Sequence, residues 1–342
     1  MSIFELPSFE LTMSLVALVV AAVLSAVIIL AIRPLLLRYA LARPNARSSH
    51  RVPTPQGAGI AVIAATLLAA GAVMIGADAV ELRIPAAVLA ATLFIAVVGL
   101  ADDIKSIEVL PRLLLQAIAV AAVIFTASSD LRVVAACPLW IERAVLLLAG
   151  LWFVNLVNFM DGLDWMTVAE VVPLTAALAL MGAAGALPPQ GLVAALALCG
   201  AMIGFAYFNR PVAVLFLGDV GSLPIGLLLG WLLVLLAGSG HLAAAVLLPL
   251  YYLADATITL LRRLIRREPI WQAHRTHFYQ RATDGGFSVP EVVARVFLGN
   301  LVLCALALVT VMAPSRTGNI VALALGTALV GWLLLTFARG KK

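Results

Sequence analysis

Long apolar stretches recur along the whole chain, and they constrain its fold more than any other feature. Hydrophobic residues make up 64% of the 342 positions and charged residues only 11%, too few polar side chains to cover a soluble core of this size. Eleven stretches of about 17–22 residues are each long enough to span a bilayer. They lie at about 12–32, 57–76, 84–100, 112–128, 140–157, 167–187, 191–208, 221–237, 242–261, 292–312 and 319–337. The sequence therefore predicts an all-α fold, a polytopic transmembrane helical bundle of about 11 spans that forms a single integral-membrane domain over residues 1–342.

The positions of lysine and arginine predict the orientation of this bundle. With the N-terminus outside and eleven spans, only Arg83, Arg132, Arg143 and Arg316 of the 22 basic residues fall outside. The other basic residues and the C-terminus lie on the cytoplasmic side, as positive charge in short loops requires. The same rule, together with attraction to anionic lipid headgroups, accounts for the net charge of +5. The basic excess therefore predicts no nucleic-acid partner.

Carboxylates at the ends of these apolar stretches predict a polar site at the membrane surface. A carboxylate at membrane depth costs about 3 kcal/mol on insertion scales, yet five aspartates border the stretches: Asp102, Asp103, Asp161, Asp164 and Asp219. All five fall on the predicted cytoplasmic face, where a site could hold a divalent cation and phosphates. The polar loops of that face are 33–56, 101–111, 158–166, 209–221 and 262–290.

The segment 155–165 carries the strongest local pattern. Asn155, Asn158, Asp161 and Asp164 are spaced by three, so that neighbouring members would share a helix face, and Gly162 indicates the point where the helix gives way to a loop. Asn and Asp suit hydrogen bonding to a sugar or base, and Asp suits a cation. Helix C-capping is the alternative, but it does not explain four such groups after one apolar span.

Two further segments place acids beside glycine or beside each other. Asp102 and Asp103 are adjacent, so at least one needs a cation or a raised pKa; an acidic helix end balanced by Lys105 is the simpler alternative. In 208–222, Gly218 and Gly221 flank Asp219 and allow close approach of a ligand.

Two basic loops offer donors for phosphates. The first, 43–59, combines arginines with the hydroxyl of Thr54, and its X-Pro steps prevent regular helix. In the last, Arg275 and His277 lie beyond an arginine run that is mostly topogenic, and could bind a diphosphate. A purely topogenic role is the alternative for both loops.

Together these motifs resemble one family. Pro53-Thr-Pro with Gly57, Asp102-Asp103, Asn155-x-x-Asn-x-x-Asp-Gly-x-Asp164, Phe208-Asn with Phe216-x-Gly-Asp-x-Gly-Ser222, and Asp255 followed by Leu261-Arg-Arg and Arg275-x-His277 occur in the order found in polyprenyl-phosphate N-acetylhexosaminyl-1-phosphate transferases. This superfamily includes MraY and WecA, and the chain is most similar to the WecA-type subgroup that initiates O-antigen and related surface glycans. In the late motif only His277 matches, because Tyr279 and Gln280 occupy two histidine positions.

The resemblance implies an enzyme of the bacterial cytoplasmic (inner) membrane whose active site faces the cytoplasm. It would transfer a sugar-1-phosphate from a UDP-N-acetylhexosamine to undecaprenyl phosphate, giving undecaprenyl-diphospho-sugar and UMP, with Mg²⁺ or alternatively Mn²⁺. Membrane lipids surround such an enzyme, and a homodimer is compatible with the family.

The resemblance also suggests a role for each motif. Asp219 would bind the metal, and Asp102 or Asp103 would deprotonate or orient the lipid phosphate. The substrate-binding candidates are Thr54, Asn155, Asn158, Asp161, Asp164, Asn209, Arg275 and His277.

A membrane transporter or lipid flippase is the rival hypothesis, because intramembrane carboxylates also mark ion pathways. It predicts acids near mid-helix and towards both leaflets. In this sequence they gather towards one face, beside Gly and Asn loops, which favours the transferase.

Overall fold

The structure, a computed structural model, is an all-helical bundle with one small sheet. It describes residues 8–42, 53–76, 83–269 and 274–341. The helices are α1 (Ser8–Tyr39), α2 (Gly59–Gly76), α3 (Ala86–Ile104), α4 (Val109–Thr126), α5 (Leu139–Met160), α6 (Met166–Ala183), α7 (Pro189–Ala206), α8 (Asp219–Gly238), α9 (Leu242–Leu247), α10 (Leu250–Ile265), α11 (Phe278–Asp284), α12 (Val289–Met312) and α13 (Arg316–Arg339). The strands β1 (Leu41–Ala42) and β2 (Thr54–Pro55) pair antiparallel.

The apolar stretches form helices because a helix satisfies all its backbone hydrogen bonds within one segment, which a lipid environment demands. Nine helices in the described part of the chain are long and apolar enough to cross a membrane. The shorter α2 and the pair α9 and α10 account for the other two predicted stretches. The all-α prediction is confirmed, while the count of eleven spans and the orientation stay predictions.

The ninth predicted span, 242–261, was expected as one helix and is two. The chain leaves α9 after Leu247 and starts α10 at Leu250, with Pro249 between them. Proline lacks the N–H that a continuous helix needs and clashes with the preceding turn. The break lets α10 take a direction of its own.

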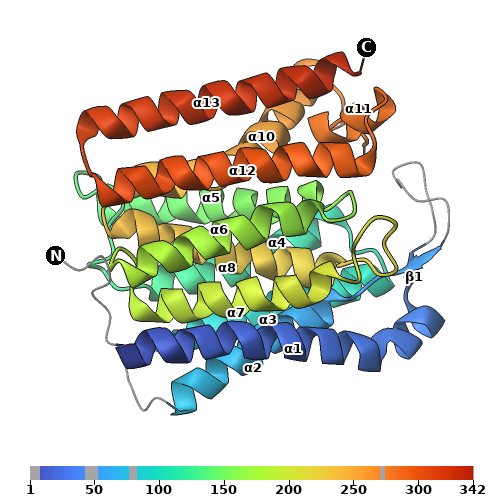
Figure 1. Cartoon of the computed structure of the whole chain (residues 1–342), viewed down its shortest axis with the longest axis horizontal. Helices are drawn as coiled ribbons and strands as arrows, with labels where there is room; N and C mark the ends of the chain where they lie inside the picture. Colours follow the sequence, from blue (N-terminus) through green and yellow to red (C-terminus); the bar gives the residue numbers. More distant parts are fainter. Residues whose placement is uncertain (1–7, 43–52, 77–82, 270–273, 342) are drawn as a thin grey trace.

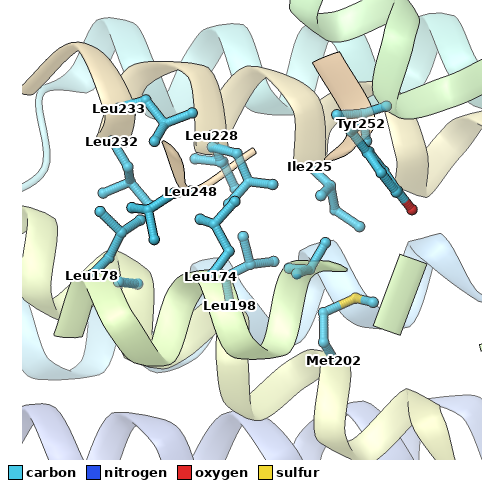
Figure 2. Packing of buried hydrophobic residues seen from close by; sticks show 14 of the residues in the cluster. Leu174, Leu178, Leu198, Met202, Ile225, Leu228, Leu232, Leu233, Leu248 and Tyr252 are labelled. Carbon is cyan, nitrogen blue, oxygen red and sulfur yellow. The ribbon is translucent and has the colours of Figure 1, made fainter. Parts of the chain in front are cut away.

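Helix α8 occupies the centre of the bundle. It packs against α2, α3, α5 and α9. Of its most apolar 18-residue stretch, 89% is buried inside the protein. Figure 2 shows this interior, where leucines of α6, α7 and α8 meet Leu248 and Tyr252. In contrast α1 lies at one side of the bundle, opposite α12 and α13 (Figure 1), and it exposes Val19, Val23 and Val27. These exposed apolar side chains form a face suited to lipid.

The ends of the bundle are also distinct. In Figure 1, α1 begins at one end of the bundle and α13 finishes at the other. Two of the helices have serine caps: Ser288 and Glu291 form a capping box on α12, and Ser315 accepts a hydrogen bond at the start of α13. The carboxyl ends of α3 and α5 and the amino end of α8 meet at one place, and there the candidate site lies.

Candidate active site

The amino end of α8 is the centre of the site, and its cap comes from another helix. Gly218 precedes α8 with φ of +77°, a conformation that glycine adopts without strain. The Asp103 carboxylate accepts hydrogen bonds from the backbone N–H groups of Asp219 and Val220, both at 3.0 Å. These donors are among those that a helix start leaves unsatisfied. The second residue of the acidic pair thus fixes Asp219 in place.

Glycines let the helices around this point touch backbone to backbone. A Cβ on Gly99 of α3 would lie 2.3 Å from the Asp219 carbonyl oxygen, and one on Gly59 of α2 would lie 2.3 Å from Gly221 Cα. No side chain larger than hydrogen fits at either crossing. The close approach brings the end of α3, and with it the acidic pair, onto the start of α8.

The carboxyl groups of Asp102 and Asp219 are in hydrogen-bonding contact with each other. Two ionised carboxylates in such contact repel each other unless a proton or a cation lies between them. Asp102 is held by the Arg112 guanidinium, with Nη1 to Oδ2 at 2.8 Å, and by the Ile107 N–H at 2.6 Å. The Asn158 amide donates to Asp219 Oδ1 at 2.7 Å and to Ser222 Oγ at 2.9 Å. Asp102 and Asp219 are therefore both fixed in position by their neighbours.

Asp102 and Asp219 are suited to an open site for a divalent cation, and not to a closed site in which protein side chains supply all the ligands. Among the described residues, no group of three His, Cys, Asp or Glu side chains is arranged to hold a metal ion. Mg²⁺ is commonly bound by one or two carboxylates, with water and substrate phosphates completing its ligands. Asp219 and Asp102 supply such a half-site, and the contact between their carboxyl groups is what a bound cation would relieve.

Asp161 and Asp164 follow the end of α5 rather than continue it. The helix ends at Met160, and Asp161 is the C-cap, one residue before the predicted end at Gly162. The pKa of the Asp161 carboxyl is raised to about 6, mainly by burial, which the Thr167 hydroxyl opposes and the nearby charges of Asp103 and Asp164 reinforce. Asp161 thus belongs to the same group of carboxylates, and the proximity of so many acids again favours a cation.

Three other predicted residues hold the framework of the site. Asp164 accepts the Ala213 N–H at 2.9 Å. Asn209 accepts the Trp165 N–H at 2.7 Å and donates to the Leu215 carbonyl at 3.0 Å. These bonds tie the segment after α5 to the segment before α8. The structure therefore gives Asp164 and Asn209 positioning contacts, and substrate contact by either stays a prediction.

Asn155 lies deeper in the bundle than its partners in the motif. Its amide donates to Gln116 Oε1 at 2.7 Å and to the Leu151 carbonyl at 2.8 Å. The spacing of three predicted a shared face only for neighbouring members, because a turn of 3.6 residues rotates successive members away from each other. Within the motif, Asn158 contacts Asp219 directly. Asp161 lies close enough to Asp103 for the charge of Asp103 to act on it.

The first basic loop reaches the site through its described end. Thr54 is buried in β2, while 43–52, with the loop arginines, lie outside the described residues. Gln56 pairs with Phe216 in a parallel bridge, and its side-chain amide donates to the Asp103 carbonyl at 3.1 Å. Gln56 was missed from the sequence, because a lone glutamine in a turn carries no distinctive signal.

The late loop packs against the end of α5. His277 is buried, with Nδ1 at 3.3 Å from Asp255 Oδ1, and Asp255 also accepts the Phe278 N–H at 2.9 Å. The Tyr279 hydroxyl donates to the Phe159 carbonyl at 2.9 Å, two residues before Asp161. Tyr279, which replaces a family histidine, thereby joins this loop to the aspartates.

Arg275 lies nearer the surface than His277. Its guanidinium pairs with Asp284, Nη2 to Oδ1 at 3.1 Å, and donates to Thr283 Oγ1 at 3.0 Å. Both partners belong to α11. The structure thus places Arg275 beside the loop that reaches the aspartates, and its contact with a diphosphate stays a prediction.

Comparisons with known proteins match the part of the chain that contains these aspartates. The family model for glycosyl transferase family 4 matches residues 85–237. A Bacillus subtilis (strain 168) protein named "Probable undecaprenyl-phosphate N-acetylglucosaminyl 1-phosphate transferase" is 26% identical over 83% of this chain and 82% of its own length. A Gluconacetobacter diazotrophicus protein named "Phospho-N-acetylmuramoyl-pentapeptide-transferase" is 30% identical over 45% of this chain and 47% of its own length. With the motifs in their place around α8, the chain is similar to glycosyl transferase family 4 and to proteins of the MraY/WecA-like superfamily.

Proposed function

We propose that this protein transfers an N-acetylhexosamine-1-phosphate from a UDP-sugar to undecaprenyl phosphate. The observation that carries the proposal is the convergence of Asp102, Asp103, Asn158 and Asp219 at one end of an apolar bundle. A lipid nucleophile and a water-soluble nucleotide sugar can both reach such a place. The printed names of the two relatives support a sugar-1-phosphate transferase.

The reaction joins two anions. An oxygen of the lipid phosphate would form a bond to the sugar-bearing phosphorus. The bond from that phosphorus to the bridging oxygen would break, and this oxygen would leave as part of UMP with the electron pair of the bond. Charge repulsion between the phosphates is the main obstacle, and positioned donors and cations lower it. A Mg²⁺ ion held by Asp219 and Asp102 would neutralise part of the diphosphate charge when bound.

The protein's own side chains would then act by position. Asp103 keeps the start of α8 in place, and Arg112 keeps Asp102 from swinging away from Asp219. The Asn158 amide orients the Asp219 carboxylate through a single hydrogen bond. Either Asp102 or Asp103 would orient the lipid phosphate, since the oxygens of both carboxylates already accept hydrogen bonds within the protein.

The more specific parts of the proposal concern the sugar and the pathway. The relative that matches over most of the chain is named for N-acetylglucosamine, so UDP-N-acetylglucosamine is the first sugar to test. We also propose that the product initiates O-antigen or another surface glycan. The site would face the cytoplasm in the bacterial inner membrane, where UDP-sugars are available.

The decisive experiment is an activity assay with the purified full-length protein. It would be incubated with undecaprenyl phosphate, Mg²⁺ and a panel of UDP-sugars, and UMP release would be measured. The expected result is UMP with a UDP-N-acetylhexosamine, lost when undecaprenyl phosphate is omitted or EDTA is added. UMP release independent of the lipid, or none with any sugar, would contradict the proposal.

A further inference from the structure

A second polar site lies between the end of α10 and α11. A cavity of about 250 Å³ is lined by Arg262, Arg263, Arg266 and Arg281, here called the arginine pocket. Glu268, Thr259 and Thr276 complete its lining. None of these residues belongs to the aspartate group around α8, so the pocket needs an explanation of its own.

The positive charge of the arginine pocket is largely unbalanced. Its single carboxylate, Glu268, pairs with Arg263 at 3.0 Å. Within the described part of the chain Arg262, Arg266 and Arg281 have no carboxylate partner. The buried Nε of Arg263 also has no hydrogen-bond acceptor among the described residues. Guanidinium groups gathered without acids suit phosphate oxygens, which accept several N–H donors at once.

Exposed apolar side chains lie next to the pocket arginines on α10. Leu261, Leu264 and Ile265 of α10 are 51%, 58% and 80% exposed, and they alternate with the arginines of the pocket along the chain. A helix with basic residues on one face and exposed apolar residues on another lies at a membrane surface. A ligand that joins a phosphate to acyl chains would suit both features, because the phosphate would enter the pocket and the acyl chains would cover the exposed apolar side chains.

We propose that the arginine pocket binds the phosphate of an anionic phospholipid headgroup. The guanidinium groups would donate N–H hydrogen bonds to the phosphate oxygens. Such a lipid would also hold α10 and α11 together, because Arg281 belongs to α11 and the other three arginines to the end of α10.

The pocket is connected to the rest of the site by one chain of contacts. The Thr259 hydroxyl donates to Asp255 at 3.3 Å, and Asp255 contacts His277 of the late loop. A lipid bound in the pocket would therefore stabilise the loop from the side away from the aspartates. This role concerns binding and does not depend on the reaction proposed above.

Native mass spectrometry of the full-length protein in detergent tests the proposal. The protein would be titrated with phosphatidylglycerol and phosphatidylcholine of identical acyl chains, and the bound lipids counted. Arg266→Gln removes one charge from the pocket. Arg267→Gln removes the same charge from the next arginine, which is also exposed but does not line the pocket. The expected preference for phosphatidylglycerol falls about fivefold in Arg266→Gln and less than twofold in Arg267→Gln.

Equal losses in the two variants, or equal binding of the two lipids by the unaltered protein, would overturn the proposal. Competition identifies the source of the phosphate. Millimolar inorganic phosphate should leave phosphatidylglycerol bound, since it brings no acyl chains to α10. Displacement by inorganic phosphate would assign the pocket to a soluble anion. Displacement by substoichiometric undecaprenyl phosphate would assign it to the proposed substrate, and either result rejects the phospholipid.

Discussion

Asp219 has two structural features that are costly for a carboxylate. It opens a central, buried helix, and its carboxyl group touches that of Asp102. The cost of such an arrangement is repaid only if a cation or proton is part of the working state. The function of this residue is thus best tested by removing its charge and keeping its shape.

Asp219→Asn should lower turnover about 10²-fold or more, because the amide cannot offset the charge of a cation. The variant should still insert and purify as a folded protein, since Asn keeps an acceptor for Asn158. UMP release and size-exclusion profiles check the two halves. Asp130→Asn is the control, because Asp130 is exposed in the connection between α4 and α5. Near-normal turnover of Asp219→Asn would move the metal role to Asp102, Asp103 or Asp161.

Arg275→Lys should raise the KM for the UDP-sugar about tenfold, because lysine cannot clamp phosphate oxygens through two planar donors. The KM for undecaprenyl phosphate should change little. Arg267→Lys, an equal substitution in the basic run, should leave both constants as they are. Kinetics with each substrate varied in turn decide this. A shift in the lipid constant alone would remove Arg275 from the nucleotide side.

Part of this site was predictable residue by residue. The aspartates stood out because charge next to an apolar span is costly, so each one marks a place with compensating partners. The partners themselves were hidden. Arg112 was counted only as a topogenic charge, and its pairing with Asp102 depends on the tight connection between α3 and α4. Asp103 caps a helix 116 positions away, which local sequence patterns cannot reveal.

The helices follow from the apolar stretches, and their joints follow from small residues. Stretches such as 84–100 and 140–157 became α3 and α5 with ends displaced by only a few residues. The break at Pro249 was missed because Leu247, Leu248 and Leu250 keep the stretch uniformly apolar. The start of α8 was expected near Ser222 and lies at Asp219, because Asp103 supplies the cap that the local sequence lacks.

Two glycines of α2 separate a packing role from helix propensity. Gly59→Ala should lower the melting temperature of the detergent-solubilised protein by several degrees, because a Cβ there overlaps the Gly221 backbone. Gly71→Ala places a Cβ in open space and should raise stability by about 0.5–1 kcal/mol, through better helix propensity. If both variants melt alike, α2 and α8 do not cross as closely as described.

The whole bundle has a direction that the two termini make visible. Figure 1 places the start of α1 and the finish of α13 at opposite ends, and the aspartates of the candidate site lie together where α3 and α5 end and α8 begins. The odd number of crossings indicated by the arginines stays a prediction. The sequence predicted the separation because basic loops obey one rule along the entire chain. Which end faces the cytoplasm needs a measurement in cells.

Cysteine labelling of intact cells gives that measurement. Ser315→Cys, at the start of α13, should react with an impermeant thiol reagent, and Ser106→Cys, after α3, should react only after lysis. The background variant should carry Cys137→Ser, because Cys137 is partly exposed while Cys199 and Cys304 are buried. Labelling of Ser106→Cys in intact cells would show that the topology is the reverse of the predicted one.

The glycine crossings have a consequence for how this protein diverges from its relatives. Where two backbones touch without side chains between them, the distance is set by the van der Waals radii of backbone atoms and cannot be tuned by exchanging one hydrophobic residue for another. The lipid-facing surfaces and the outer helices can then drift in composition while the carboxyl groups keep their mutual positions. A relative that retains only 26% of the residues would preserve the same arrangement of carboxyl groups as long as it keeps hydrogen as the side chain at those crossings.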